Sequence, residues 1–172
     1  MPGTSNKGSP ACTRVAGLPP VTGRYPRILI LGSFPGRRSL LQNEYYGNPL
    51  NQFWKIADNL LAVPAGLPYL RRRALLMARG IALWDIIRSC CREGSADNRI
   101  RNPRFNDIGA FVSRFPSIRF IALNGSTAGR FFRQLDLPGS LPSEILPSTS
   151  PANTRYSFAQ KADRWSIIAR YL

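Results

Sequence analysis

Four short apolar runs, each followed by a glycine or a polar residue, alternate with longer segments of helical periodicity. The runs cover residues 27–31, 80–85, 118–123 and 143–146. A continuous apolar run of this length is typical of a strand that is buried on both faces. Strands that alternate with helices predict a parallel sheet covered by helices on both sides. The sequence therefore predicts a three-layer α/β/α domain with a four-stranded parallel sheet.

The rest of the chain divides into a tail, helices and one long loop. Residues 1–24 are rich in Gly, Pro and Ser and lack periodicity, so we expect a flexible tail there. Residues 25–172 are expected to form a single domain, long enough to bury a core. A loop is expected over residues 92–104. Helices are expected from about residue 51, over 71–79, 106–115 and 126–135, and from about 157 to 171.

Arginine dominates the charge of the chain. The sequence has 24 Lys and Arg residues against 9 Asp and Glu residues, a formal net charge of +15. Such an excess favours a polyanionic partner, because each phosphate that is neutralised releases counterions. The composition of a GC-rich genome would explain arginine in place of lysine, but not the scarcity of acids. Nucleic acid is therefore the favoured partner.

The chain contains no histidine, which excludes histidine-based triads, metal sites and general bases. Its cysteines, Cys12, Cys90 and Cys91, do not provide a disulfide framework or the four thiolates of an iron–sulfur cluster. We expect reduced cysteines, no metal, no iron–sulfur cluster and no cofactor. The start of the chain lacks the apolar segment of a signal peptide, and no apolar run approaches the roughly 20 residues of a membrane helix. We expect a soluble, cytoplasmic protein without a membrane partner.

Polar or glycine-rich segments follow each predicted strand. They cover residues 32–36, 84–85, 124–125 and 147–151. In open parallel α/β sheets, ligands bind at the carboxyl ends of the strands. The four segments are therefore expected to meet at one edge of the sheet and to form a site there.

Several motifs occur in a fixed order along these segments. They are Gly32-Ser33-Phe34-Pro35-Gly36, Ser39-Leu40, Tyr45-Tyr46-Gly47-Asn48-Pro49, Asn51-Gln52-Phe53-Trp54 and Leu146-Pro147-Ser148-Thr149-Ser150-Pro151-Ala152-Asn153. The ordered set resembles the uracil-DNA glycosylase superfamily, and within it the deoxyinosine (hypoxanthine) DNA glycosylase branch. The resemblance implies a uracil-DNA glycosylase-like fold and a monomeric, monofunctional DNA glycosylase. Its substrate would be DNA containing uracil or hypoxanthine, and its product an abasic site for base excision repair.

The implied reaction places the water-orienting role on asparagine. In many relatives the residue corresponding to Ser33 is an Asp or Asn that activates water, and serine is a poor base without a partner. The resemblance implies that an asparagine further along takes over, and the chain offers Asn48 and Asn51. An amide can orient water and solvate the cationic sugar, but it cannot act as a Brønsted base. A helix N-cap is the alternative for Asn51, and Asn48 is slightly favoured for the chemistry.

A base flipped out of the duplex needs an aromatic floor and polar groups at its edge. Tyr46 matches an aromatic that stacks on the base in relatives, an interaction worth roughly 1–3 kcal/mol. Asp85 falls where relatives often carry a base-contacting asparagine, and a carboxylate could accept from the N–H of uracil or hypoxanthine. A structural cap after the strand is the alternative for Asp85, and a strand-ending turn is weighed ahead for Asn124. The full set expected at the base is Gly32, Phe34, Tyr46, Asp85 and Asn124, while Tyr45, Phe53 and Trp54 are expected in the core.

The last motif corresponds to the loop that enters the minor groove in relatives. Its expected DNA contacts are Pro147, Ser148, Thr149 and Ser150, with Arg155 close enough in sequence to hold a phosphate. A simple Pro-Ser turn is the alternative. Superfamily members often carry a histidine before this Pro-Ser, and Leu146 stands there instead, so backbone amides or hydroxyls would have to support the departing base.

Two alternatives stay open at this point. The arginines at positions 99, 101 and 104 adjoin Gly94-Ser95-Ala96-Asp97-Asn98, a segment that the family also has, and this loop either contacts DNA or is solvated charge. Ser33 and Leu146 both replace expected catalytic residue types. A non-catalytic nucleic-acid-binding module on the same scaffold is therefore the second function class.

Overall fold

The structure is a computed structural model that describes residues 12–137 and 141–172. Its central sheet has four parallel strands, which confirms the predicted sheet. In spatial order they are β3 (Ile81–Asp85), β2 (Ile28–Gly32), β6 (Phe120–Asn124) and β7 (Ser143–Leu146). Every residue of the central strand β2 is buried, as a continuous apolar run predicts.

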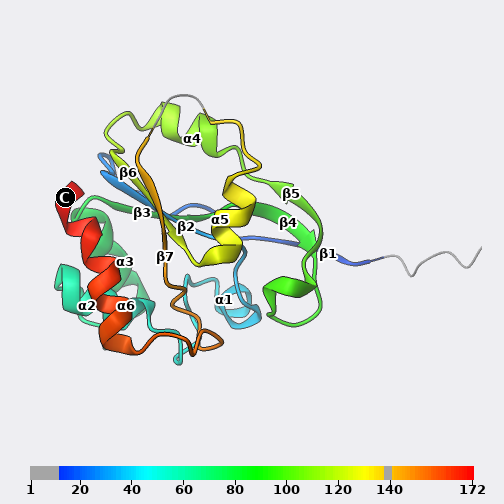
Figure 1. Cartoon of the computed structure of the whole chain (residues 1–172), viewed down its shortest axis with the longest axis horizontal. Helices are drawn as coiled ribbons and strands as arrows, with labels where there is room; N and C mark the ends of the chain where they lie inside the picture. The colour runs from blue at the N-terminus through cyan, green and yellow to red at the C-terminus, as the bar shows by residue number, and fades with distance from the viewer. Residues whose placement is uncertain (1–11, 138–140) are drawn as a thin grey trace, which may run out of the picture.

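Helices cover both faces of this sheet, which gives the expected three layers (Figure 1). Because side chains alternate along a strand, Ile28 and Ile30 enter one core while Leu29 and Leu31 enter the other. The first core is closed by α2 (Phe53–Leu61), α3 (Tyr69–Ala78) and α6 (Phe158–Trp165). The second is closed by α4 (Ile108–Arg114) and α5 (Ser126–Phe132). A short helix, α1 (Arg37–Gln42), follows the loop after β2.

The helix boundaries differ from the expected ones by a few residues. The helix expected from residue 51 begins at Phe53, and the one expected over 71–79 starts two residues earlier, at Tyr69. The last α-helix ends at Trp165, and the chain continues as the 3₁₀ helix η2 (Ser166–Tyr171). In the part of the chain that the structure describes, no helix has the length and apolarity that crossing a membrane requires.

A second, antiparallel sheet stands beside the first, and the sequence did not predict it. It consists of β1 (Arg14–Ala16), β4 (Ile87–Cys91) and β5 (Arg101–Phe105). The loop expected over residues 92–104 is therefore wrong at its carboxyl end, and between the two strands the chain forms only the 3₁₀ helix η1 (Asp97–Arg99). β5 escaped prediction because only one of its five side chains, Phe105, is large and apolar.

The expected tail over residues 1–24 is also too long. Leu18 and Val21 are buried in the first core, and Val21 pairs with Leu83 of β3. These two side chains close the edge of the sheet at β3, which explains why a segment rich in Gly and Pro is held there. Residues 1–11 lie outside the described residues.

Two of the three cysteines form a disulfide, which corrects the expectation of reduced thiols. Cys12 is joined to Cys91, with a Cα–Cα distance of 5.8 Å that lies in the normal range for a disulfide. The physical reason is the pairing of β1 with β4, in which Arg14 lies opposite Cys91 and brings the start of the described chain alongside. Cys90 is a free, buried cysteine.

Candidate active site at the carboxyl ends of the parallel strands

The four parallel strands end at one edge of the sheet, where the sequence places its polar segments. Gly32 of β2 lies opposite Asp85 of β3, and Asn124 of β6 lies opposite Leu146 of β7. The loops after these strands therefore meet there, at the lower side of the sheet in Figure 1. This edge is the candidate active site.

The Asn124 side chain links the segment between β2 and β3 to the loop after β7. Its Nδ2 donates hydrogen bonds to Tyr46 Oη (3.2 Å) and Thr149 Oγ1 (3.0 Å), and its Oδ1 accepts from the backbone N of Thr149 (2.9 Å). The strand-ending turn weighed for Asn124 is present as well, since Gly125 follows with φ of 98°. A side chain at Gly125 would collide with Ser148, whose Cβ lies 2.8 Å from the position of the missing Cβ.

Tyr46 is held rigidly in this network. Its ring stacks on Phe53, with ring centroids 3.9 Å apart and planes 21° from parallel. Its backbone has φ of 55°, a conformation that a non-glycine residue rarely adopts. Burial and the nearby charge of Asp85 raise the pKa of the Tyr46 phenol, so this hydroxyl stays protonated. Phe53, Trp54 and Tyr45 are core residues, as expected.

Asp85 is the most unusual polar residue of the edge. Its side chain is buried, with 5% of the residue exposed, and its Oδ2 has no hydrogen-bond partner among residues 12–137 and 141–172. Burial is the largest cause that raises the pKa of Asp85, the charge of Asp97 adds to it and Arg92 opposes it, and the result is a pKa of about 7. A side chain at Gly32 would collide with Oδ1 of Asp85, so the Asp85 carboxylate would have to shift.

Ser33 has a carboxylate partner that the sequence did not reveal. The Ser33 hydroxyl donates a hydrogen bond of 2.6 Å to Oδ2 of Asp97, which lies in η1 after β4. The other carboxylate oxygen, Oδ1, lies 3.7 Å from Nη1 of Arg92, an ion pair rather than a hydrogen bond. Burial raises the pKa of Asp97, while the Ser33 hydroxyl and the charges of Arg92 and Arg130 act in the opposite direction.

Arg92 fixes the loop after β2 from behind. Its side chain is almost fully buried, its guanidinium donates to the backbone oxygen of Pro35, and its Cζ lies 4.7 Å from the centre of the Phe34 ring. Phe34 itself is buried in the second core. Phe34 was predicted to contact a base, but Arg92 already covers one face of its ring.

Asn48 and Asn51 both bind backbone amides close to themselves in the chain. Oδ1 of Asn48 accepts from the N of Leu50 (3.0 Å), and Oδ1 of Asn51 accepts from the N of Phe53 (2.9 Å) at the start of α2. The capping role weighed for Asn51 is thus present. Nδ2 has no hydrogen-bond partner among the described residues in either case, so these amides keep a donor for water.

The loop after β7 is braced by two residues of α6 that sequence reasoning missed. Trp165 Nε1 donates to the backbone oxygen of Pro147 (2.9 Å). Lys161, although almost fully buried, donates to Oε1 of Gln52 and to the backbone oxygen of Asn153, both at 2.9 Å. The only available signal was a lysine on the apolar face of a predicted helix.

The predicted DNA-contacting residues lie on or beside this braced loop. Ser148 Oγ accepts from the backbone N of Ser150 (3.2 Å), which is the turn weighed as the alternative, and Thr149 is fully buried. Arg155 is exposed, with its guanidinium over the ring of Tyr156. The loop therefore presents Ser150 and Arg155 from a fixed backbone.

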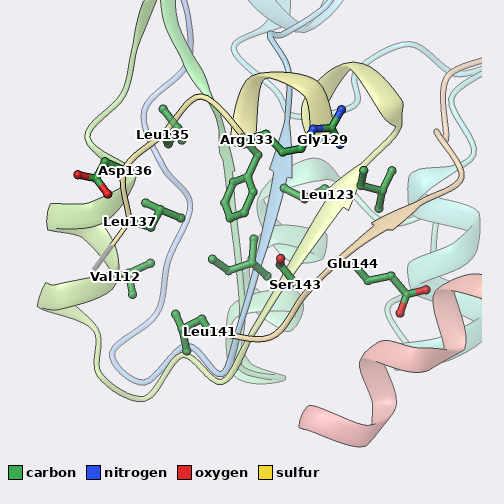
Figure 2. A pocket seen from close by; sticks show the side chains of 13 residues that line it. Val112, Leu123, Gly129, Arg133, Leu135, Asp136, Leu137, Leu141, Ser143 and Glu144 are labelled. Carbon is green, nitrogen blue, oxygen red and sulfur yellow. The ribbon is translucent and has the colours of Figure 1, made fainter. Parts of the chain in front are cut away.

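A cavity of about 670 Å³ lies away from the strand-end edge, between α5 and the outer strand β7 (Figure 2). Its lining includes Leu123, Phe132 and Leu141 and is mostly apolar. None of the predicted site residues lines it, so its size does not make it the functional site. Within residues 12–137 and 141–172, no three potential metal ligands are grouped together.

The fold and these strand-end loops define an α/β protein with a candidate ligand site at the carboxyl edge of a parallel sheet. Within that class, residues 19–170 match the Uracil DNA glycosylase superfamily, and the chain belongs to this superfamily.

The chain is similar to two curated relatives over nearly their whole lengths. The hypoxanthine DNA glycosylase of Methanosarcina acetivorans is 33% identical over 156 residues, which are 90% of this chain and 98% of the relative. That of Methanosarcina barkeri is 32% identical over 151 residues, 87% and 94% of the two chains. The solution NMR structure of a candidate uracil DNA glycosylase from M. acetivorans superimposes with a TM-score of 0.78 at 31% identity, covering 92% of this chain and 98% of that one.

Proposed function

We propose that the chain is a monofunctional DNA glycosylase that hydrolyses the N-glycosidic bond of a deaminated base, uracil or hypoxanthine, in DNA. Membership of the superfamily and the names of the two Methanosarcina relatives support this activity. The product is an abasic site, the starting point of base excision repair. We also propose a cytoplasmic location and a monomeric working form.

The observation that carries the proposal is the unpartnered Oδ2 of Asp85. A buried polar atom without a partner costs free energy, so it calls for a ligand that supplies the missing hydrogen bond. Deamination converts the base edge into an N–H beside a carbonyl oxygen, in both uracil and hypoxanthine. The ionised Asp85 carboxylate accepts from this N–H, a bond that the lone pair at N1 of adenine or N3 of cytosine cannot provide.

The remaining predicted residues take complementary roles around the flipped nucleotide. Tyr46 provides the aromatic surface for the base, held in place by Phe53 and Asn124. Asn48 or Asn51 orients the water with its amide nitrogen or with the second lone pair of its amide oxygen, since only one lone pair accepts from the backbone. Gly32 lets the backbone come close to the base.

The loop after β7 grips the DNA backbone. Pro147, Ser148 and Ser150 enter the minor groove, and Arg155 contacts a phosphate. Thr149 was also predicted to contact DNA, but it is fully buried and hydrogen-bonded to Asn124, so it holds the loop in place instead. Leu146 is buried and cannot support the departing base anion, which leaves backbone amides and hydroxyls of the loop for that role. The net charge of +15 adds a sequence-independent attraction to DNA.

The test uses duplex oligonucleotides with a single uracil, hypoxanthine, xanthine or G·T mismatch, incubated with the protein and then cleaved by alkali. We expect strand breaks at uracil or hypoxanthine, and a loss of about tenfold or more in rate for Asp85→Ala, because an interaction with the reacting base is removed. Asp163→Ala, which removes an exposed acid of α6, is the matched control and should keep the wild-type rate. Binding to every duplex without any strand break would favour the non-catalytic nucleic-acid-binding module instead.

A further inference from the structure

Ser33 and Asp97 form a hydroxyl–carboxylate pair between two loops that are 64 residues apart in sequence. The distance of 2.6 Å from Oγ to Oδ2 lies in the range of strong O–H···O⁻ hydrogen bonds. In such a pair the carboxylate draws the hydroxyl proton toward itself, so the serine oxygen becomes a better proton acceptor. Ser33 therefore has a carboxylate partner that allows its oxygen to accept a proton.

The loop that carries Asp97 is tied to the loop after β2 at further points. Arg92 contacts both the Asp97 carboxylate and the backbone oxygen of Pro35, and Oγ of Ser95 accepts from the backbone N of Arg37 (3.0 Å). Because Arg92 is almost fully buried, this arrangement is fixed by the core rather than by surface contacts. The Asp97 carboxylate is thus held at a defined position beside Ser33.

The Ser33–Asp97 pair lies close to the buried Asp85 carboxylate, which the proposed base would contact. Ser33 directly follows Gly32, which packs against the Asp85 carboxylate, and Oδ2 of this buried carboxylate has no hydrogen-bond partner in the part of the chain that the structure describes. The charge of Asp97 also raises the pKa of Asp85. A base held by Asp85 therefore has its sugar near the loop that contains Ser33.

The amides of Asn48 and Asn51 cannot carry out one step of the reaction, the removal of a proton from water. They can hold a water molecule, but they cannot accept the proton that it releases. We propose that Asp97, acting through Ser33, accepts this proton, an inference that rests on the glycosylase function proposed above.

In this step the water oxygen bonds to C1′ of the sugar while the C1′–N bond breaks and its electron pair leaves with the base. The water proton passes to Oγ of Ser33 as the Ser33 hydroxyl proton passes to Oδ2 of Asp97. Solvent then protonates the departing base, and Asp97 returns its proton to solvent.

Four groups face Asp97 and influence when it is ionised. Three of them shift its pKa: the Ser33 hydroxyl, Arg92 after β4 and Arg130 of α5. The fourth is Asp85 at the end of β3, whose own pKa the charge of Asp97 raises. Below the pKa of Asp97 its carboxylate is protonated and resembles an amide. The rate advantage of the wild type over Asp97→Asn must therefore shrink as the pH falls.

The experiment measures single-turnover base release by wild type, Asp97→Asn, Ser33→Ala, the double variant and Glu93→Gln from about pH 4.5 to 9, a range that spans the titration of a buried carboxyl. The amide in Asp97→Asn retains an oxygen that accepts from Ser33, so the loop contact survives, and a thermal melt checks this. We expect Asp97→Asn to be about 100-fold slower or more at pH 8, with the ratio shrinking toward one at acid pH. Glu93, an exposed acid of the same loop, should change the rate by less than about twofold when substituted. The double variant should be no slower than Asp97→Asn alone, because the two residues act as a unit.

Three results would overturn the proposal. The first is an Asp97→Asn rate within about threefold of wild type at pH 8, well short of the effect of a general base. The second is an equal loss at every pH, which indicates a purely structural role, and the third is independent, multiplying effects of the two substitutions. A wild-type chain that releases no base from any duplex would overturn the glycosylase function itself, and is thereby distinguished from these outcomes.

Discussion

Replacing Asp85 by asparagine should stabilise the protein, and more so as the pH rises. The substitution keeps the shape of the side chain but removes a charge that the folded protein holds in a buried site. The folded pKa of about 7, compared with an ordinary value of 3.8, means that the folded state resists ionisation of Asp85. At 1.36 kcal/mol per pH unit this difference amounts to about 4 kcal/mol.

The sign follows from which state binds the proton. Below pH 3.8 Asp85 is protonated in both states and costs nothing. Between that value and pH 7 the unfolded chain ionises while the folded chain does not, so the free energy of unfolding falls with rising pH. Above pH 7 the whole penalty is present, and the Asp85→Asn variant never incurs it.

Urea denaturation of both proteins at about pH 5 and pH 8.5 measures this effect. The advantage of the asparagine variant should grow by roughly 3 kcal/mol between the two conditions, since most of the penalty develops in that interval. Asp163→Asn, at an exposed position of α6, is the control that should show little change. A stability difference between wild type and Asp85→Asn that is the same at both pH values would refute the reasoning.

Four further substitutions, at three residues, test the packing, the stacking and the charge of the site. Gly32→Ala should cost about 1–3 kcal/mol in urea denaturation and slow base release, because its methyl group collides with the Asp85 carboxylate. Tyr46→Phe should slow base release by at most about tenfold, since it loses one hydrogen bond and keeps the ring. Tyr46→Ala should weaken binding of damaged DNA by roughly 1–3 kcal/mol in a fluorescence titration. Arg155→Ala should reduce the slope of log affinity against log salt by about one, and Arg170→Ala should not.

Matched controls make these results interpretable. Gly66→Ala adds a methyl group with no atom within 4 Å and should leave stability almost unchanged, so an equal effect at both glycines would contradict the packing argument. An equal loss of binding affinity in Tyr46→Phe and Tyr46→Ala would assign the effect to the hydrogen bond and contradict stacking. The η2 helix that carries Arg170 packs on the β6 strand, where Tyr171 stacks on Phe120 at the end far from the site. The same salt slope for both arginine variants would therefore remove Arg155 from the DNA contacts.

The parallel sheet was predictable because its strands are buried on both faces and so form continuous apolar runs. The antiparallel sheet was not, since a strand such as Arg101–Phe105 lies at an edge and carries arginines and a proline. The disulfide depended on that sheet, because Cys12 comes near Cys91 only when β1 pairs with β4. Local pattern identifies a buried strand, but it does not identify a polar edge strand that tertiary contacts hold in place.

The same distinction applies to the site. Gly32, Asp85 and Asn124 were predictable because each ends a recognisable strand, and parallel strands end at one edge. The partner of Ser33 could not be found this way, since Asp97 reaches it across 64 residues through a loop with no apolar pattern. Lys161 was equally hidden, because its importance lies in the backbone oxygen that it holds rather than in its own sequence context.

The central claim is that this chain removes a deaminated base from DNA. The most direct measurement is chromatographic detection of free base after the purified protein is mixed in excess with duplexes containing a single hypoxanthine or a single uracil. We predict release of one free base per duplex from at least one of the two, with an intact sugar–phosphate backbone until alkali is added. Tight binding of both duplexes without any free base would contradict the account.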